Sequence, residues 1–263
     1  MLTLIKAGGS LLNDAARQKE IAAQIAGLVK SGERVVVVHG GGKKLTGLLG
    51  RLGVESRFHE GLRITCAETM DAALMALCGS VNKRLVADFI AAGVSAVGIC
   101  GGDGATVRAK KFMHPTVDYG FVGTVTSVDT GLVNLLLGGG RLPVVACIAL
   151  GGDGSYYNIN ADSMAAAMAG ALKADRLVFL TDVGGVLDAG GAVMPSLDPA
   201  EIARLIDAKV ISGGMLPKMR ACVAAVRSGA GSVTVLGGAE PDGLKRLLMD
   251  GEHIGTEITG GAL

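Results

Sequence analysis

The sequence has no tryptophan, and aromatic residues make up only 3% of its 263 positions. Proteins that bind single-stranded nucleic acid without sequence preference stack the bases on aromatic side chains, so the composition does not favour that class. The formal net charge of +1 gives no general attraction to nucleic acid or to an anionic membrane surface. With 49% hydrophobic residues, the chain has instead the composition of a globular protein with a large core.

Long apolar runs are missing as well, because glycine or a charged residue interrupts each run before it reaches the length of a membrane span. The N-terminal residues do not form a basic segment followed by an apolar one, so no signal peptide is indicated and we expect a cytoplasmic protein. The five cysteines are scattered and form no C-x-x-C pair, which is typical of reduced, buried thiols. The four histidines show no metal-ligand spacing, so we expect no metal site built by the protein.

Two common nucleotide-binding signatures are absent: the P-loop pattern G-x-x-x-x-G-K-[ST], and G-x-G-x-x-G followed by an acidic residue after the first strand. The chain has instead Val35–Val38, followed by His39, Gly40, Gly41 and Gly42. A run of β-branched residues predicts a strand that is buried on both faces, as in a parallel sheet. Glycines between such a strand and a helix let backbone N–H groups approach an anion, and the positive end of the helix favours it.

A second stretch near the N-terminus has the same form, since the apolar residues Leu2–Ile5 lead into Lys6, Ala7, Gly8 and Gly9. Two loops of this kind indicate one phosphate group that is bound from two sides. The structural alternative is that each glycine pair is simply a tight turn between a strand and a helix, with Lys6 as a solvated strand end.

Hydrophobic periodicity predicts strands and helices that alternate along the chain. The predicted strands are residues 2–7, 35–38, 95–100, 142–150, 177–181, 233–236 and 254–259, with strand-like spacing also in 105–128. The predicted helices are residues 13–30, the segment from the glycine loop to 52, the segment from 68 to 92, and residues 130–137, 161–172, 199–207, 216–228 and 241–249. This order favours an α/β protein with an open, mainly parallel sheet and helices on both faces.

The connections carry three further expectations. Residues 54–65 resemble a hairpin or lid beside the glycine loops, and Thr65 with Glu68 forms a candidate capping box for the long helix that follows. The turn at 151–158 is the best candidate for a boundary. We expect a single domain over residues 1–263, with an N-terminal lobe of about 1–150 and a C-terminal lobe of about 151–263 on one continuous sheet.

Four polar residues stand out beyond the glycine loops. Arg63 follows the predicted hairpin, Asn158 and Asp162 lie at the start of an alanine-rich helix, and Lys218 lies in the first turn of another helix. A cation in the first helical turn opposes the helix dipole, so a nearby anion is expected to compensate Lys218. The structural alternatives are a surface charge for Arg63 and a helix cap for Asp162.

Taken together, the motifs resemble those of the acetylglutamate kinases in the amino acid kinase superfamily. The segments that carry the resemblance, in chain order, are KAGG at 6–9, HGGG at 39–42, GLRIT at 61–65, VNKRLV at 81–86, DYGFVG at 118–123, YNINAD at 157–162, LTDVGGVLD at 180–188 and GGMLPK at 213–218. The resemblance covers essentially the whole chain. Ala7 and the Gly-Lys-Lys segment at 42–44 depart from the family pattern without removing a group that the chemistry needs.

The resemblance implies a three-layer α/β sandwich that phosphorylates N-acetyl-L-glutamate with ATP, which brings its own Mg²⁺, in arginine biosynthesis. The implied catalytic residues are Lys6, Lys218 and Asp162, with Asp162 between the two lysines. The implied phosphate-binding residues are Gly8, Gly9 and Gly41, and the implied substrate-binding residues are Gly41, Gly42, Arg63 and Asn158. The implied nucleotide-binding residues are Asp182, Val183, Gly184, Gly185, Val186, Leu187, Val210, Ile211, Ser212, Gly213, Gly214 and Met215.

Two alternatives remain open at this point: a sister kinase that acts on an aminoadipate derivative or an isoprenoid phosphate, and a non-catalytic nucleotide-binding regulator. We expect a homodimer whose interface is the helix of residues 68–92, which is rich in Met, Ala and Leu (Met70, Ala73, Leu74 and Leu77); the structural alternative is that this face belongs to the core. Members of the family that are inhibited by arginine carry an extra helix before the first strand. Since Met1 alone precedes the first predicted strand here, we expect no inhibition by arginine.

Overall fold

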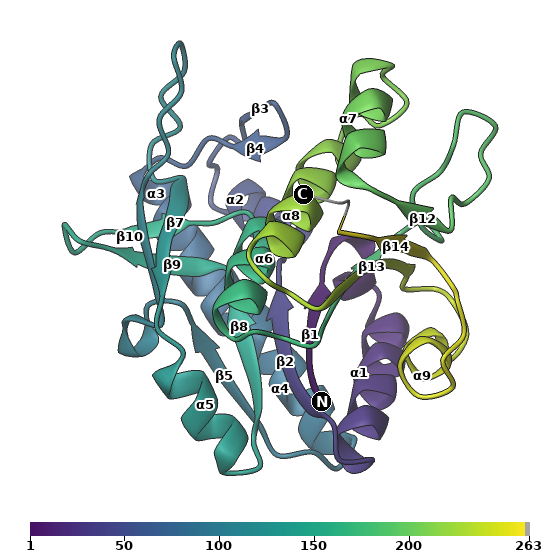
Figure 1. The fold of residues 1–263 in the computed structure, drawn as a ribbon. Helices are drawn as coiled ribbons and strands as arrows, with labels where there is room; N and C mark the ends of the chain where they lie inside the picture. The colour runs from purple at the N-terminus through teal and green to yellow at the C-terminus, as the bar shows by residue number, and fades with distance from the viewer. Residues whose placement is uncertain (261–263) are drawn as a thin grey trace.

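The computed structural model describes residues 1–260, and at Gly9 and Ser10 it describes the backbone alone. The strands of its main sheet are β1 (Leu2–Ala7), β2 (Arg34–His39), β5 (Ala96–Cys100), β8 (Leu142–Ala146), β11 (Arg176–Thr181), β12 (Ser196–Leu197), β13 (Ser232–Gly237) and β14 (Thr256–Ile258). They form an eight-stranded sheet with the order β12-β14-β13-β11-β1-β2-β8-β5 (Figure 1). All neighbouring pairs run parallel except β13 and β14, so the predicted mainly parallel sheet is confirmed.

Helices cover both faces of this sheet and close two hydrophobic cores (Figure 1). The helices are α1 (Ala15–Lys30), α2 (Gly42–Arg51), α3 (Ala67–Ala73), α4 (Asn82–Ala91), α5 (Gly131–Gly138), α6 (Ala161–Ala171), α7 (Pro199–Asp207), α8 (Met215–Arg227) and α9 (Gly243–Leu248). Val35 and Val37 of β2 pack in the core closed by α1, α4 and α9, whereas Val36 and Val38 pack in the core closed by α2, α6 and α8. The strand is therefore buried on both faces, as its composition predicts.

A second, four-stranded sheet was not predicted. It has the order β10-β9-β6-β7 and is built from β6 (Val107–Lys111), β7 (Gly123–Val128), β9 (Ile148–Gly151) and β10 (Tyr156–Asn158). The prediction of one strand over 142–150 is wrong, because the chain leaves the main sheet after Ala146 and resumes in the second sheet at Ile148. The buried Cys147 lies at this change of sheet, where its carbonyl accepts a hydrogen bond from the N–H of Ile159 at 3.0 Å.

The segment 151–158 contains a turn and the short strand β10, which pairs antiparallel with β9 to form a hairpin, as expected. Within this hairpin, the N–H of Gly151 donates to the carbonyl of Ser155 at 2.8 Å. The predicted hairpin in 54–65 is also present, as β3 (Phe58–His59) paired antiparallel with β4 (Leu62–Arg63). The division of the chain into two lobes stays a prediction.

The predicted long helix consists of α3, a π-helical segment η2 (Leu74–Val81) and α4 in direct succession. The predicted cap at Thr65 is wrong, since Cys66 is the N-cap and no side chain caps the helix. Thr65 is fully buried, and its hydroxyl donates instead to the carbonyl of Arg63 at 2.9 Å. Of the residues expected at an interface, Met70, Ala73 and Leu77 are buried in the chain's own core.

Among the described residues, none of the helices combines the length and the apolar character that a bilayer span requires.

Candidate active site

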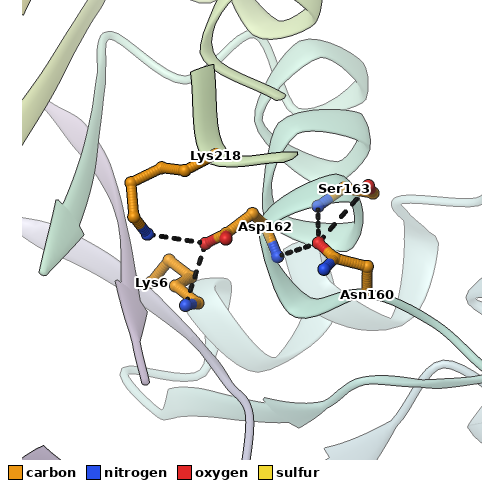
Figure 2. Close-up of polar contacts among 5 residues, drawn as sticks. All are labelled: Lys6, Asn160, Asp162, Ser163 and Lys218. Carbon is orange, nitrogen blue, oxygen red and sulfur yellow. Dashed lines mark hydrogen bonds and ion pairs between the residues drawn. The ribbon is translucent and has the colours of Figure 1, made fainter. Parts of the chain in front are cut away.

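Three charged side chains from distant parts of the sequence meet at one end of the sheet (Figure 2). Lys6 lies near the end of β1, Asp162 in the first turn of α6, and Lys218 in the first turn of α8. The Nζ atom of Lys6 is 2.8 Å from Oδ1 of Asp162, and the Nζ atom of Lys218 is 3.1 Å from the same oxygen. All three residues are buried, with exposed fractions of 7%, 8% and 6% for Lys6, Asp162 and Lys218.

Asp162 is available to the lysines because another residue caps its helix. Oδ1 of Asn160 accepts hydrogen bonds from the N–H groups of Asp162 at 3.0 Å and Ser163 at 3.1 Å (Figure 2). The structural alternatives of a cap for Asp162 and a solvated strand end for Lys6 are therefore wrong.

The charges in this cluster depend on one another. Burial on its own raises the pKa of Asp162, but the charges of Lys6 and Lys218 and their hydrogen bonds outweigh it and hold that pKa below its usual value. Burial lowers the pKa of Lys218, and the neighbouring charge of Lys6 lowers it further. The ammonium of Lys218 also lies 5.4 Å from the centre of the Phe179 ring. The cluster therefore contains two cations and one carboxylate, and its net positive charge can bind a further anion.

Gly8 gives the side chain of Lys6 its room. A Cβ atom at Gly8 would collide with the Nζ and Cε atoms of Lys6. The lysine side chain therefore occupies space that any larger residue at position 8 would need. Gly9 begins the short 3-10 helix η1 (Gly9–Leu12), and the surroundings of Gly9 lie outside what the structure describes.

The second glycine loop is held by a buried histidine at the end of β2. His39 is fully buried, and burial lowers its pKa to about 4. Its ring is therefore neutral near pH 7, with Nδ1–H donating to the carbonyl of Gly40 at 2.8 Å and Nε2 accepting from the Asn82 amide at 3.0 Å. Asn82 also donates to the carbonyl of Val144 at 2.9 Å, which ties the loop to α4 and β8.

Gly41 lies against the π-helical segment η2. A Cβ atom at Gly41 would come within 2.7 Å of Cδ2 of Leu77 and 3.2 Å of Cγ2 of Val81, both from η2. A side chain at this position would push the loop away from the helix. Segments of π-helix are often found at functional sites, and here the segment packs under the predicted phosphate loop.

A cavity of about 400 Å³ opens beside Lys6. Its lining includes Lys6 and Gly8 from the first loop, Gly40–Gly42 from the second, and the hairpin residues Phe58 and Arg63. The cavity therefore joins both glycine loops to the predicted substrate residues.

Arg63 is buried rather than a surface charge, and its hydrogen bonds fix it to the cavity wall. Its Nη2 donates to the carbonyl of Gly42 at 3.0 Å and to the Thr46 hydroxyl at 2.8 Å, and its Nη1 donates to the Ser56 hydroxyl at 2.8 Å. The guanidinium also stacks on the ring of Phe58, with its Cζ 4.5 Å from the ring centre. Three of the five N–H donors of Arg63 are thus used, and Nε–H and one Nη1–H have no partner among the described residues, so each of them can donate to an oxygen of a bound carboxylate.

Asn158 faces the same cavity from β10. Its Nδ2 donates to the hydroxyl of Thr65 at 3.3 Å, and its backbone N–H donates to the carbonyl of Phe121 at 2.8 Å. Thr65 thus supports both Arg63 and Asn158, although sequence analysis assigned it only a cap.

The predicted nucleotide segments are close to the elements that carry the lysines, one after the strand paired with β1 and the other just before α8. Asp182–Gly185 directly follows β11, whose Phe179 is the sheet partner of Lys6. Val210–Met215 leads into α8 and Lys218, with Gly213 at φ 54°, a left-handed conformation that glycine adopts readily. Val186 is buried, and its N–H donates to the Thr256 hydroxyl at 2.8 Å.

Several site residues were missed as such from the sequence: His39 as a neutral anchor, Asn82, Ser56, Thr46 and Thr65. A signal for Asn82 was present in the VNKRLV segment. Asn82 lies three residues before the apolar Leu85 and therefore on the same, buried side of the helix. The hydroxyl partners of Arg63 carry no comparable signal, since Ser and Thr are ordinary residues in turns and helices.

The chain resembles known proteins over its whole length. The family model described as "Amino acid kinase family" matches residues 1–237. A protein of Solibacter usitatus named acetylglutamate kinase is 46% identical over 258 residues, which cover 98% of this chain and 99% of that protein. An acetylglutamate kinase of Acidobacterium capsulatum is 48% identical over 236 residues, with 90% of each chain covered.

Solved structures share the fold. A crystal structure of a Streptococcus mutans UA159 protein has a TM-score of 0.85 and 31% identity, with 99% of both chains covered. N-acetylglutamate synthase from Neisseria gonorrhoeae, complexed with coenzyme A and N-acetyl-glutamate, has a TM-score of 0.88 and 25% identity over all of this chain and 60% of that one. Isopentenyl phosphate kinase, at 20% identity and a TM-score of 0.71, shares the fold alone.

The chain therefore belongs to the amino acid kinase family, in agreement with its sheet and its paired glycine loops. Within that family, the curated proteins that it resembles over nearly its whole length are acetylglutamate kinases. The resemblance predicted from the sequence motifs is thus confirmed.

Proposed function

We propose that the protein transfers the γ-phosphoryl group of ATP to the side-chain carboxylate of N-acetyl-L-glutamate. The products are ADP and N-acetyl-L-glutamyl 5-phosphate, the second step of arginine biosynthesis. The similarity to acetylglutamate kinases supports this activity. The observation that carries it is the pair of buried lysines on one carboxylate oxygen, beside a cavity that contains Arg63.

The reaction joins two anions, so positioning and charge stabilisation account for most of the catalysis. An oxygen of the acceptor carboxylate attacks the γ-phosphorus, and the bond from phosphorus to the bridging oxygen breaks as ADP leaves. No general base is needed, because the acceptor carboxylate is already ionised near pH 7. Lys6 and Lys218 stabilise the charge that develops on the transferring group, and Asp162 holds them in place.

Backbone groups and Arg63 fix the two substrates. N–H groups at Gly8, Gly9 and Gly41 bind phosphoryl oxygens. The donors of Arg63 that have no partner among the described residues bind the α-carboxylate of the acceptor, with Asn158, Gly41 and Gly42 at its other polar groups.

ATP enters with Mg²⁺ as a substrate and binds along Asp182–Leu187 and Val210–Met215. The one carboxylate of the catalytic cluster has its Oδ1 taken by two lysines, which fits a magnesium ion brought by the nucleotide rather than one held by a protein cage.

The experiment that tests the activity is the production of ADP with three acceptors in parallel: N-acetyl-L-glutamate, free L-glutamate and an N-acetylated aminoadipate. We expect turnover with the first and a kcat/KM lower by at least tenfold with the others. Preference for the aminoadipate derivative would identify a sister kinase. ATP binding without turnover of any acceptor would identify a non-catalytic regulator.

We also propose that the protein is a cytoplasmic homodimer. Since Met70, Ala73 and Leu77 lie in the core, the interface is the outward face of the same long helix, where Met75 is 56% exposed. The strand β5 lies at the edge of the main sheet next to this helix, and an unpaired edge strand is a natural site of association.

A further inference from the structure

Three side chains outside the phosphoryl-transfer site lie close together although the sequence separates them. His59 and Glu60 belong to the β3–β4 hairpin, and His114 belongs to the connection between β6 and β7. One ring nitrogen of each histidine and one carboxylate oxygen of Glu60 lie within 4.8 Å of one another. The two imidazole rings are 5.5 Å apart and nearly perpendicular.

We propose that His59, Glu60 and His114 bind one divalent transition-metal ion, and that this ion fastens the β3–β4 hairpin to the β6–β7 connection. Two imidazoles and one carboxylate form the ligand set of three-ligand zinc sites, in which water takes the fourth position. Imidazole nitrogen also selects such ions over Mg²⁺, which prefers oxygen ligands. The site is therefore separate from the magnesium that accompanies ATP.

The hydroxyl group of Tyr119 orients one of the ligands. It lies 2.6 Å from Nδ1 of His59 and donates to the carbonyl of the same residue at 3.4 Å. With the hydroxyl proton on that carbonyl, Nδ1–H of His59 donates to the tyrosine oxygen and Nε2 keeps its lone pair for a metal. Nδ1 of His114 instead accepts from the backbone N–H of Thr116 at 3.3 Å and lies 3.4 Å from the Thr116 hydroxyl, so its ring proton is on Nε2 and a metal at that nitrogen would displace it. The Tyr119 hydroxyl is thus the partner that prepares a ligand ring. Partners of this kind fix the ring and its tautomer in metal sites.

The frame around the cluster is well anchored. Tyr119 is buried, and its carbonyl accepts from the N–H of Thr65 at 3.0 Å. The N–H of Phe121 donates to the carbonyl of Thr65 at 2.7 Å, and a Cβ atom at Gly120 would collide with that carbonyl. An ion pair of 2.7 Å between Lys111 and Asp118 closes the base of the loop that carries His114.

The ligands can reach a metal without disturbing this frame. In a tetrahedral zinc site the ligand atoms lie about 3.3 Å apart, so the present atoms, all within 4.8 Å of one another, need to draw together by at most about 1.5 Å. Glu60 is exposed at the tip of the hairpin and the two histidines are half-buried, so both the ion and the movement are accessible from solvent.

A metal bound at this cluster would affect the cavity, because the two share the β3–β4 hairpin. The same hairpin contributes Phe58, Gly61, Leu62 and Arg63 to the lining of the cavity beside Lys6. A metal between the hairpin tip and His114 restricts the opening of this wall. Metal binding is thus coupled to the mobility of the proposed acceptor site without taking part in phosphoryl transfer.

The test is a calorimetric titration of the untagged, full-length protein with ZnCl₂ after treatment with a chelator. We expect one saturable site per chain, and no competition from millimolar Mg²⁺. His59→Ala, His114→Ala and Glu60→Gln should each weaken zinc binding by at least tenfold, and Tyr119→Phe by about tenfold as a loss of second-sphere support. His253→Ala is the matched control, because His253 is exposed and outside the cluster, and it should bind zinc as the wild type does.

Hydrogen exchange supplies a second readout that a merely structural role would not change. Zinc should slow exchange of the amides of residues 57–64 in the wild type and in His253→Ala, but not in His114→Ala. Glu60→Gln alters only an exposed tip residue, so it keeps the test meaningful if a histidine variant unfolds. Absence of saturable zinc binding, or one-to-one binding that survives in both His59→Ala and Glu60→Gln, would overturn the proposal. Neither result bears on ADP production, which tests the phosphoryl transfer separately.

Discussion

Lys6 on β1 and Lys218 on α8 donate to the same oxygen atom, Oδ1 of Asp162, although they are far apart in the sequence. Two buried ammonium groups repel each other strongly in a medium of low dielectric constant, so the carboxylate between them is what allows both to be charged. One acidic residue thus sets the position and the charge of both proposed phosphoryl-binding lysines.

Removal of either lysine should impair the chemical step more than substrate binding. We expect Lys6→Ala and Lys218→Ala to lower kcat by about 10²–10³, by analogy with the loss of one donor from an oxyanion hole. The KM values for ATP and the acceptor should change far less. Steady-state kinetics of both variants provide the measurement, with the exposed Lys110→Ala as a control. Wild-type kcat in both lysine variants would remove the cluster from the mechanism.

Asp162→Asn should lower stability as well as activity. The substitution leaves two buried ammonium groups without their anion, a loss of about 3–5 kcal/mol of unfolding free energy for a broken buried pair. Because the pKa of Asp162 is lowered in the folded state, its contribution is complete above the unfolded value near 3.9 and is lost as the pH falls through the lower folded value. Urea unfolding should therefore show a difference between wild type and variant at pH 7 that shrinks below about pH 4. The exposed Asp71→Asn is the control, and an Asp162→Asn variant as stable as wild type at pH 7 would contradict the proposed pairing.

Arg63→Ala should mainly raise the KM for the acceptor. Arg63 holds a carboxylate remote from the reacting one, so its contribution is nearly equal in the ground state and the transition state. Arg57→Ala is a close control, because Arg57 is exposed just before β3 and, within residues 1–260, its guanidinium pairs with the exposed Glu55 alone. An acceptor KM that is the same in Arg63→Ala and Arg57→Ala would exclude Arg63 from the acceptor site.

The proposed dimer can be tested at Met75. A glutamate at this exposed position on the outward face of η2 adds a charge that two-fold symmetry places near its own copy. We expect a dimeric mass for the wild type and a shift toward monomer for Met75→Glu, measured by sedimentation at micromolar concentration. Met113→Glu, at another exposed methionine, should leave the mass unchanged. A monomeric wild type would show that this helix face is ordinary surface.

Much of the fold follows from local patterns in the sequence. The run of valines in β2 predicts its strand correctly, and the helix expected over residues 199–207 is present as α7, because the deciding interactions lie within a few residues. The second sheet was missed because its strands pair across long sequence separations, as β6 does with β9. Local periodicity also gave no sign that the chain changes sheets at Cys147, since the residues on both sides are equally apolar and buried.

The site residues divide in the same way, into those that a local sequence pattern indicates and those that depend on distant contacts. The glycine loops, Lys6, Arg63 and Lys218 were singled out from the sequence as candidates, because glycine clusters follow apolar strands, a lysine in a first helical turn is unusual, and together they match the motifs of one family. The roles of Thr65 and Asn82 depend on contacts with residues far along the chain, such as Asn158 and Val144, which no local pattern encodes. His59 and His114 were set aside for lack of metal-ligand spacing, yet folding brings them together.

His39 should remain neutral down to an unusually low pH. Burial lowers its pKa to about 4, so the folded protein binds this proton less tightly than the unfolded chain, in which histidine titrates near 6.5. The stability that depends on neutral His39 is therefore complete above pH 6.5 and is lost progressively as the pH falls toward 4, by about 3 kcal/mol in total.

Two measurements check this prediction. In an NMR titration, the ring signals of His39 should stay in the neutral form to below pH 5. In urea unfolding between pH 7 and 5, His39→Gln should lose part of the decrease in stability that the wild type shows, whereas His253→Gln should retain it. A His39 ring that titrates near pH 6.5 would mean that the hydrogen bonds to Gly40 and Asn82 do not hold it neutral, and that the glycine loop is positioned in another way.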